Sequence, residues 1–292
     1  MLAVFAKCVR KYWVGYLLLL PATCFVFFIS IYPIIYAIDW SLYSTQYLQK
    51  LSFAGLSNYY EFIGSPRGMH AFLTTLIYCF GSLAISVPLS MAVASLLDRP
   101  VRGRIVFRAI ILIPWVLSQT VVALLWKWLL DPYYGPINYV LQTLGVGKVG
   151  FLSSPLLALP TLIFVNVWMS YPLGVVLILA ALQTVPRELI DAAVIDGAST
   201  WLAYRYVKFP HIKHTVLVVL ILQTLLYFNM VTLIYVSTGG GPLGATETIS
   251  IHLFKSAFEN WKIGYASSVG VIMLVFNLLF SLSYVKALRR EA

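Results

Sequence analysis

Long apolar stretches alternate with short polar gaps along this chain. Six of the stretches contain about 20 residues or more, the length with which a helix crosses the roughly 30 Å hydrocarbon core of a bilayer. They cover residues 14–38, 72–97, 109–130, 156–182, 215–236 and 266–285. None shows the ten-residue alternation of a membrane barrel strand, so we expect helices, whose backbone groups bond within one segment. The pattern predicts an all-α membrane protein with six transmembrane helices.

The composition supports this prediction and limits the mechanism. Of 292 residues, 61% are hydrophobic and 10% are charged, with a mean hydropathy of +0.88. The six spans contain no Asp or Glu, although transporters driven by protons or voltage usually bury ionisable groups in the membrane. A G-x-x-x-x-G-K-[ST] phosphate loop is also missing, and 239–242 (GGGP) is interpreted as a flexible turn. A pump built on this chain would therefore take its energy from another subunit.

Basic residues predict the orientation of the spans. By the positive-inside rule, the side with more of them faces the cytoplasm, so both termini, 1–13 and 286–292, are predicted to be cytoplasmic. The net charge of +10 is accordingly interpreted as topology and not as a nucleic-acid surface. Five basic residues fall on the outer side, and the cytoplasmic side has fourteen: Lys7, Arg10, Lys11, Arg99, Arg102, Arg104, Arg108, Arg187, Arg205, Lys208, Lys213, Lys286, Arg289 and Arg290.

Neutral polar side chains and aromatic rings occur within the last three spans. Two interpretations are open: hydrogen bonding between helices, or the lining of a wet cavity. Amides beside indole and phenol rings suit an uncharged ligand with hydroxyl edges and C–H faces, such as a sugar. The residues are Asn166, Trp168, Gln223, Tyr227, Asn229 and Asn277.

The polar gap 183–214 predicts two short helices. Pro186 suits a helix start, and Gly197 can adopt a positive φ and end that helix. Ser199 or Thr200 is expected to cap a second helix, which Pro210 is expected to stop. The gap is therefore a compact helix-turn-helix on the cytoplasmic face.

Small residues in this gap suggest its role. A helix lying among lipid headgroups is one interpretation, but Ala192, Ala193, Gly197 and Ala198 offer little apolar area for insertion. Small side chains instead permit close approach of another protein surface. We therefore expect this gap to bind a partner protein.

The same residues carry a family resemblance. The segment 187–212 resembles the EAA loop of ABC importer permeases, in which an acid and two alanines, a glycine and a hydrophobic-proline pair are matched by Asp191-Ala192-Ala193, Gly197 and Phe209-Pro210. "IDGAS" at 195–199 is similar to the sugar branch. Asp191 replaces the usual Glu, and Phe209 replaces the usual Leu. Five further segments, 53–62, 102–116, 122–138, 166–174 and 238–246, resemble the first permease subunit of carbohydrate importers of the maltose and glycerol-phosphate type.

The resemblance implies a type I ABC importer permease fold with a core over 72–285. It also implies a second homologous permease, two copies of an ABC ATPase and a periplasmic or lipid-anchored solute-binding protein, all at a bacterial cytoplasmic (inner) membrane. The chain itself would bind no cofactor, because ATP and Mg belong to the ATPase, and it would hold no catalytic residue. The EAA loop would couple the ATPase to the permease through Glu188, Asp191, Ala192, Ala193, Asp196, Gly197 and Pro210.

The resemblance also places a substrate site in the fourth and fifth spans. The family's Asn-x-Trp element falls on Asn166 and Trp168, which are retained, whereas most fifth-span positions differ, so the particular sugar is open. The implied substrate residues are Asn166, Trp168, Met169, Ser170, Leu173, Gln223, Leu226, Tyr227 and Met230.

Three alternatives stay open at this point. Glycerol phosphate or another anionic sugar derivative could use a cation from the partner permease. A membrane-embedded enzyme acting on lipid-linked sugars would usually need acids or a metal cluster, but only His211 and His214 have a ligand-like spacing, and Lys213 lies between them. No metal site is predicted. A passive channel would need a filter motif or a ring of charges, and we find neither.

Overall fold

A computed structural model describes residues 2–99 and 103–290, without the side chains of 2–12, 16 and 288–290. Six side chains from the basic residues named above lie outside this description: Lys7, Arg10, Lys11, Arg102, Arg289 and Arg290. The described chain is mainly helical and divides into two compact units, 1–64 with 255–274 and 65–254 with 275–292. Five of its helices are long and apolar enough to cross a membrane, or six if one bent pair counts as a span. The predicted fold class is confirmed.

The first unit begins with one long apolar helix. It comprises α1 (Leu2–Val26), a π-helical turn η1 (Phe27–Ile31) and α2 (Tyr32–Ser41). A two-stranded antiparallel hairpin, β1 (Tyr43–Gln46) and β2 (Gln49–Phe53), and helix α3 (Ser57–Gly64) follow. Asn58 Nδ2 donates to the carbonyls of Ser41 and Tyr43 at 2.8 and 3.0 Å. The unit also contains the turn η3 (Lys255–Glu259) and the start of α14 (Ile263–Arg290).

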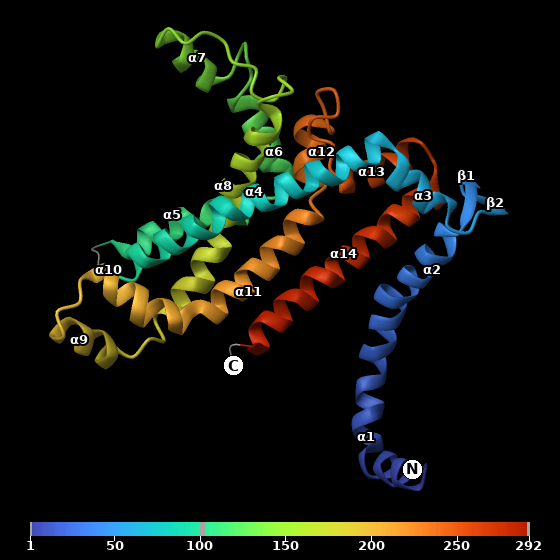
Figure 1. The fold of residues 1–292 in the computed structure, drawn as a ribbon, viewed down its shortest axis with the longest axis horizontal. Helices are drawn as coiled ribbons and strands as arrows, with labels where there is room; N and C mark the ends of the chain where they lie inside the picture. Colours follow the sequence, from blue (N-terminus) through green and yellow to red (C-terminus); the bar gives the residue numbers. More distant parts are fainter. Residues whose placement is uncertain (1, 100–102, 291–292) are drawn as a thin grey trace. The chain divides into compact units, whose positions relative to one another are not determined.

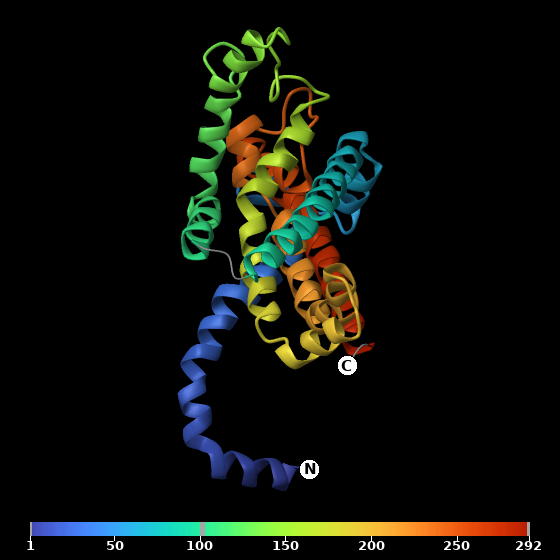
Figure 2. The ribbon, with the colours of Figure 1, turned by 90° about the vertical axis from the view of Figure 1, so that its left-hand side faces the viewer.

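The second unit is built around three packed helices, α4 (Pro66–Leu97), α8 (Ala158–Leu182) and α11 (Phe209–Phe228) (Figures 1 and 2). Helix α4 packs on α8 along much of its length. The other helices of the unit are α5 (Arg104–Val116), α6 (Gln119–Leu129), α7 (Pro136–Thr143), α9 (Arg187–Ile195), α10 (Thr200–Ala203), the π-helical turn η2 (Tyr204–Lys208), α12 (Thr232–Thr238) and α13 (Ile249–Phe254).

The third predicted span, 109–130, is not one helix. Helices α5 and α6 cover it and meet at a bend of 96°. Leu117 between them is extended, with φ −70° and ψ 142°. Ser118 then caps α6, since its Oγ accepts a hydrogen bond from the amide of Val121 at 3.3 Å. Pro114, inside α5, leaves a backbone carbonyl without a helical donor and weakens the helix just before the break.

The fifth predicted span is also wrong at both of its limits. Helix α11 ends at Phe228, and the Asn229 side chain donates to the carbonyl of Leu225 at 2.7 Å before α12 begins a new direction. At the other end, Pro210 does not stop a helix as expected. The π-helical turn η2 runs directly into α11, and Pro210 lies in the first turn of α11. The wider π turn accommodates a proline that an uninterrupted α-helix would not.

Small residues bring α4 and α8 close together. A Cβ atom added to Gly174 of α8 would lie 2.5 Å from Ser90 Oγ of α4 and 2.9 Å from its Cβ. Ser90 is held in place, because its hydroxyl donates to the carbonyls of Ser86 and Tyr171 at 2.7 and 2.8 Å. The axis-to-axis distance of this helix pair therefore depends on Gly174.

One buried acid fixes the segment between α12 and α13. The Glu247 side chain is 5% exposed. Arg67 donates to both of its oxygens, from Nε at 2.9 Å and from Nη2 at 2.9 Å, and His252 Nδ1 lies 2.8 Å from Oε1. Burial raises the pKa of Glu247, but the hydrogen bonds and charges of His252 and Arg67 outweigh it and lower the pKa to about 2. The predicted turn at 239–242 is thereby anchored to the start of α4.

We expect Gly174→Ala to lower the free energy of unfolding by about 1–3 kcal/mol, the usual cost of overpacking. Thermal unfolding of the purified protein in detergent measures the change. Gly64→Ala is the control, because a Cβ at Gly64 meets no atom within 4 Å. Equal melting temperatures for the two variants would contradict the close approach of α4 and α8.

We expect Glu247→Gln to destabilise the protein at pH 7 by about 1–2 kcal/mol, because the charge-assisted bonds from Arg67 and His252 weaken. The folded-state pKa of about 2 lies below the ordinary value of 4.5. The stabilisation is therefore complete above pH 4.5 and disappears as the pH falls toward 2.

Melting temperatures of the wild type and Glu247→Gln should accordingly converge as the pH is lowered through this window. Glu61→Gln removes an exposed carboxylate 3.9 Å from Lys262 and should change little at any pH. A difference between wild type and Glu247→Gln that stays constant from pH 7 to pH 3 would argue against the low pKa.

Candidate functional site

A buried chain of hydroxyl and amide groups joins the three central helices. Tyr227 Oη of α11 lies 2.6 Å from Ser170 Oγ of α8 and 3.2 Å from Ser86 Oγ of α4. Ser86 in turn donates to Gln223 Oε1 at 2.9 Å. Ser170, Gln223 and Tyr227 were predicted individually from sequence, and the structure brings them together. Ser86 was not predicted, although its spacing of four residues from Ser82 and Ser90 on an apolar helix was an available signal.

Some polar groups beside this chain lack partners. Among the described residues, Asn166 Nδ2 and Oδ1 and Gln223 Nε2 are buried without a hydrogen bond. The indole N–H of Trp126, on α6, is also buried without a hydrogen bond. A buried polar group without a partner costs about 1–3 kcal/mol. Such groups are suited to bind a ligand that brings its own donors and acceptors.

Aromatic rings accompany these groups. Trp168 is half-buried and meets Trp126 edge-on, with 5.4 Å between ring centroids, and Phe164 meets Trp126 in the same manner at 5.2 Å. Trp126 was not among the substrate residues proposed from sequence. It lies on the short helix α6, whereas a single continuous helix was expected over 109–130. Its indole N–H and its contact with Trp168 add it to the candidate site.

The remaining proposed substrate residues divide between core and surface. Met169 and Met230 are buried, at 7% and 5% exposure, and pack in the interior. Leu173 is half-buried, and Leu226 is 51% exposed on α11. The structure thus groups Ser170, Gln223 and Tyr227, leaves Asn166 nearby on α8 with an unpaired amide, and directs Leu226 outward.

Two other amides serve as interhelical contacts. Asn229 Nδ2 donates to Asn277 Oδ1 at 3.2 Å, and Asn277 Nδ2 returns the bond to Asn229 Oδ1 at 3.1 Å. Of the two interpretations left open from the sequence, this pair matches hydrogen bonding between helices.

The predicted EAA loop forms the two short helices expected of it. Helix α9 contains no buried residue, and Glu188 lies in its first turn. Gly197 has φ +82°, and the amide of Ala198 donates to the carbonyl of Ala193 at 2.9 Å, which closes the helix. Ser199 caps α10 by accepting from the Leu202 amide at 3.3 Å. Asp191, Ala192 and Asp196 are exposed, whereas Ala193 is half-buried.

This loop lies at one end of the second unit, with α7 at the opposite end (Figures 1 and 2). Its exposed apolar side chains include Val194, at 59%, and Ile195, at 85%. Pro210, at the end of the predicted EAA segment, lies in the first turn of α11. An exposed helix with small and apolar side chains is suited to enter a groove on another protein.

Comparisons with known proteins agree with this architecture. A model of the family described as binding-protein-dependent transport system inner membrane component matches residues 86–290. The chain is 32% identical over 278 residues to the trehalose/maltose transport system permease protein MalF of Thermococcus litoralis, with 95% of this chain and 94% of the relative covered. It is 27% identical to the sn-glycerol-3-phosphate transport system permease protein UgpA of Agrobacterium fabrum, over 77% and 76% of the two chains.

A solved structure shares the fold. It is a crystal structure of a bacterial ABC transporter involved in the import of the acidic polysaccharide alginate, with a TM-score of 0.86, 22% sequence identity and coverage of 98% of each chain. The family model spans most of the chain, including helices α8, α9 and α11. The chain belongs to the family of binding-protein-dependent transport system inner membrane components.

Proposed function

We propose that this chain is the permease subunit of an ABC importer that carries a sugar or a related polyol. The observation that supports it best is the chemistry between α4, α6, α8 and α11. Serine, tyrosine and glutamine groups bond across α4, α8 and α11, and tryptophan rings of α6 and α8 meet edge-on. Several polar atoms of these helices lack partners in the described part of the chain, and no Asp, Glu, Lys, Arg or His is among the residues named. This combination suits a hydroxyl-rich, uncharged solute.

The relatives support the same class of solute. One relative is named as a trehalose/maltose transport system permease protein. Two others are named for the transport of sulfoquinovosyl glycerol and of sn-glycerol-3-phosphate. The second candidate, a phosphorylated or otherwise anionic sugar derivative, follows from the latter names. For this chain it would require a cation from the partner permease, because the site described above contains none. An enzyme acting on lipid-linked sugars has no support from a family of transport components.

The proposed complex contains a second homologous permease, two ABC ATPase subunits and a solute-binding protein outside. Both termini and the EAA loop would face the cytoplasm of a bacterium, and the ATPase would bind ATP and Mg. Closure of the ATPase pair on ATP would move α9 and, with it, the rigid helices α8 and α11, alternately opening the site to each side of the membrane. The chain's own residues would bind the solute and transmit force without performing hydrolysis.

We expect Trp168→Ala to reduce solute uptake by roughly tenfold at limiting solute, the effect of losing about 1.4 kcal/mol of binding. ATP hydrolysis without solute should stay measurable, because Trp168 lies on α8 and outside the EAA loop. Uptake of labelled solute into vesicles containing the complete complex, with ATPase activity in parallel, measures both.

Trp128→Ala, which alters a 57% exposed indole on α6, is the control and should transport normally. Unchanged uptake in Trp168→Ala would show that this ring only packs against Trp126. If Trp168→Ala lowered the uptake rate of a phosphorylated sugar and left that of the neutral sugar unchanged, the result would favour the anionic candidate.

We expect Gly197→Asp to abolish stimulation of ATP hydrolysis by the loaded binding protein while the chain still inserts and assembles. A Cβ at Gly197 meets no atom within 4 Å, and φ there is +82°. Beyond the backbone strain that any side chain causes at this φ, only contact with another subunit would make the added bulk and charge harmful. ATPase assays of the reconstituted complex, with and without loaded binding protein, measure the effect.

Gly145→Asp is a matched control for this variant. Gly145 has φ +79°, close to the +82° of Gly197, and its Cβ position is also open to solvent. Backbone strain is therefore the same in both variants, and only Gly197→Asp should lose stimulation. Normal stimulation in Gly197→Asp would refute the proposed role of the loop.

A further inference from the structure

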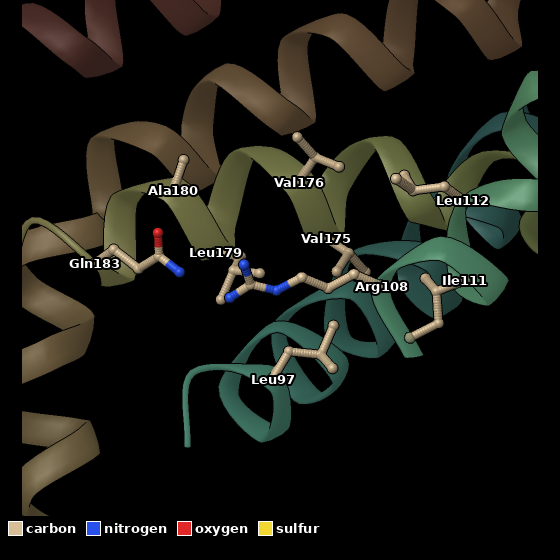
Figure 3. Close-up of a pocket in the computed structure, with 9 residues that line it drawn as sticks. All are labelled: Leu97, Arg108, Ile111, Leu112, Val175, Val176, Leu179, Ala180 and Gln183. Atoms are coloured by element: carbon tan, nitrogen blue, oxygen red, sulfur yellow. The ribbon is translucent and has the colours of Figure 1, made fainter. Parts of the chain in front are cut away.

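A pocket lies between α4, α5 and α8, away from the candidate substrate site (Figure 3). Seven of its nine lining residues are apolar, among them Ile111, Leu112 and Leu179. The other two are Arg108, from α5, and Gln183, which follows α8. The pocket is therefore an apolar groove with one cation in it.

The Arg108 guanidinium lacks an acceptor in the described part of the chain. Its Nε and Nη2 atoms are buried, and neither makes a hydrogen bond. Figure 3 shows the side chain extending from α5 along the pocket toward Leu179 and Gln183. Arginine keeps its charge in proteins and presents its donors as a rigid fork. A buried fork without an acceptor is costly, and an anion in the pocket would remove that cost.

The level of the pocket along the membrane-spanning helices indicates which anion would fit. Leu97 is the last residue of α4, Gln183 is the C-terminal cap of α8, and Arg108 lies in the second turn of α5. All three helices thus begin or end at this level, which is where membrane-spanning segments meet the lipid headgroups. Phosphates of phospholipids occur at this level, with acyl chains directly beneath them.

The neighbouring acid does not neutralise Arg108. Asp98, the residue after α4, accepts from Lys208 Nζ at 2.6 Å and makes its ion pair there. The apolar side chains of Ile111 and Leu112 lie at the other side of the pocket from Gln183 (Figure 3). A free phosphate would gain nothing from this apolar wall, whereas an amphiphile would use both the cation and the wall.

We propose that the pocket binds an anionic phospholipid. Its phosphate accepts hydrogen bonds from Arg108 Nε and Nη2, and an acyl chain covers Ile111, Leu112 and Val175. The lipid joins α5 to the end of α8, four residues before α9 begins at Arg187. It therefore supports the segment through which motion of the EAA loop would reach α8.

The test is a lipid-binding measurement and does not depend on the identity of the transported solute. The importer complex is purified with its subunits, stripped of lipid in detergent and titrated with phosphatidylglycerol, and bound lipid is counted by native mass spectrometry. We expect Arg108→Gln to weaken binding at this site by about tenfold, as expected for the loss of a bidentate charge-assisted contact. Inorganic phosphate in excess should not displace the lipid.

Two further variants make the test specific. Ala180→Phe fills the pocket and leaves Arg108 in place, so it should also lose the lipid. Arg104→Gln removes an exposed charge one turn earlier on α5 and should bind as the wild type does. Wild-type lipid binding in Arg108→Gln and Ala180→Phe would overturn the proposal. The proposal would also be overturned if the Arg108→Gln complex lost the second permease while lipid binding stayed unchanged. That result would assign Arg108 to a carboxylate of that subunit.

Discussion

The need to satisfy polar groups away from water shapes the central part of this structure. Within a bilayer, a hydroxyl or amide has only the protein as a partner. The hydroxyl groups of Ser86, Ser170 and Tyr227 meet this requirement by bonding across three helices. Close packing makes those bonds possible, since Gly174 allows α4 and α8 to approach until Ser90 reaches the carbonyl of Tyr171. Small residues and polar contacts therefore depend on each other in this core.

The sequence was sufficient for the features that follow from local chemistry. Length and hydropathy predicted four of the six spans as single helices, since hydrocarbon thickness sets the length of an apolar segment. The signals at Pro186, Gly197 and Ser199 predicted both ends of α9 and the start of α10, because capping and positive φ are properties of single residues. These elements required no knowledge of what packs against them, which is why they could be predicted from sequence.

Other features depend on residues far apart in the chain, and hydropathy does not report them. Both sides of the bend between α5 and α6 are equally apolar, and only Pro114 and Ser118 mark it. The pairing of Glu247 with Arg67 joins positions 180 residues apart. Trp126 entered the candidate site only once the bend was known. Candidate substrate residues were thus proposed one by one from sequence, whereas the network that joins Ser170, Gln223 and Tyr227 depends on packing.

The geometry of α8 links the two candidate functional regions directly. Ser170 and Leu182 lie twelve residues apart on one continuous helix, a rise of about 18 Å at 1.5 Å per residue. Four residues, 183–186, then lead to α9. On the other side of the loop, α10 and η2 run into α11, which carries Gln223 and Tyr227, without an intervening coil. A displacement of α9 would therefore be delivered through two continuous helices, of which α8 contains Pro172, to both halves of one hydrogen-bonded network. Because that network closes on Ser86 of α4, a relative movement of α8 and α11 must break or exchange its hydrogen bonds. The amide atoms of Asn166 and Gln223 that lack partners lie on these two moving helices, where they could take part in such an exchange.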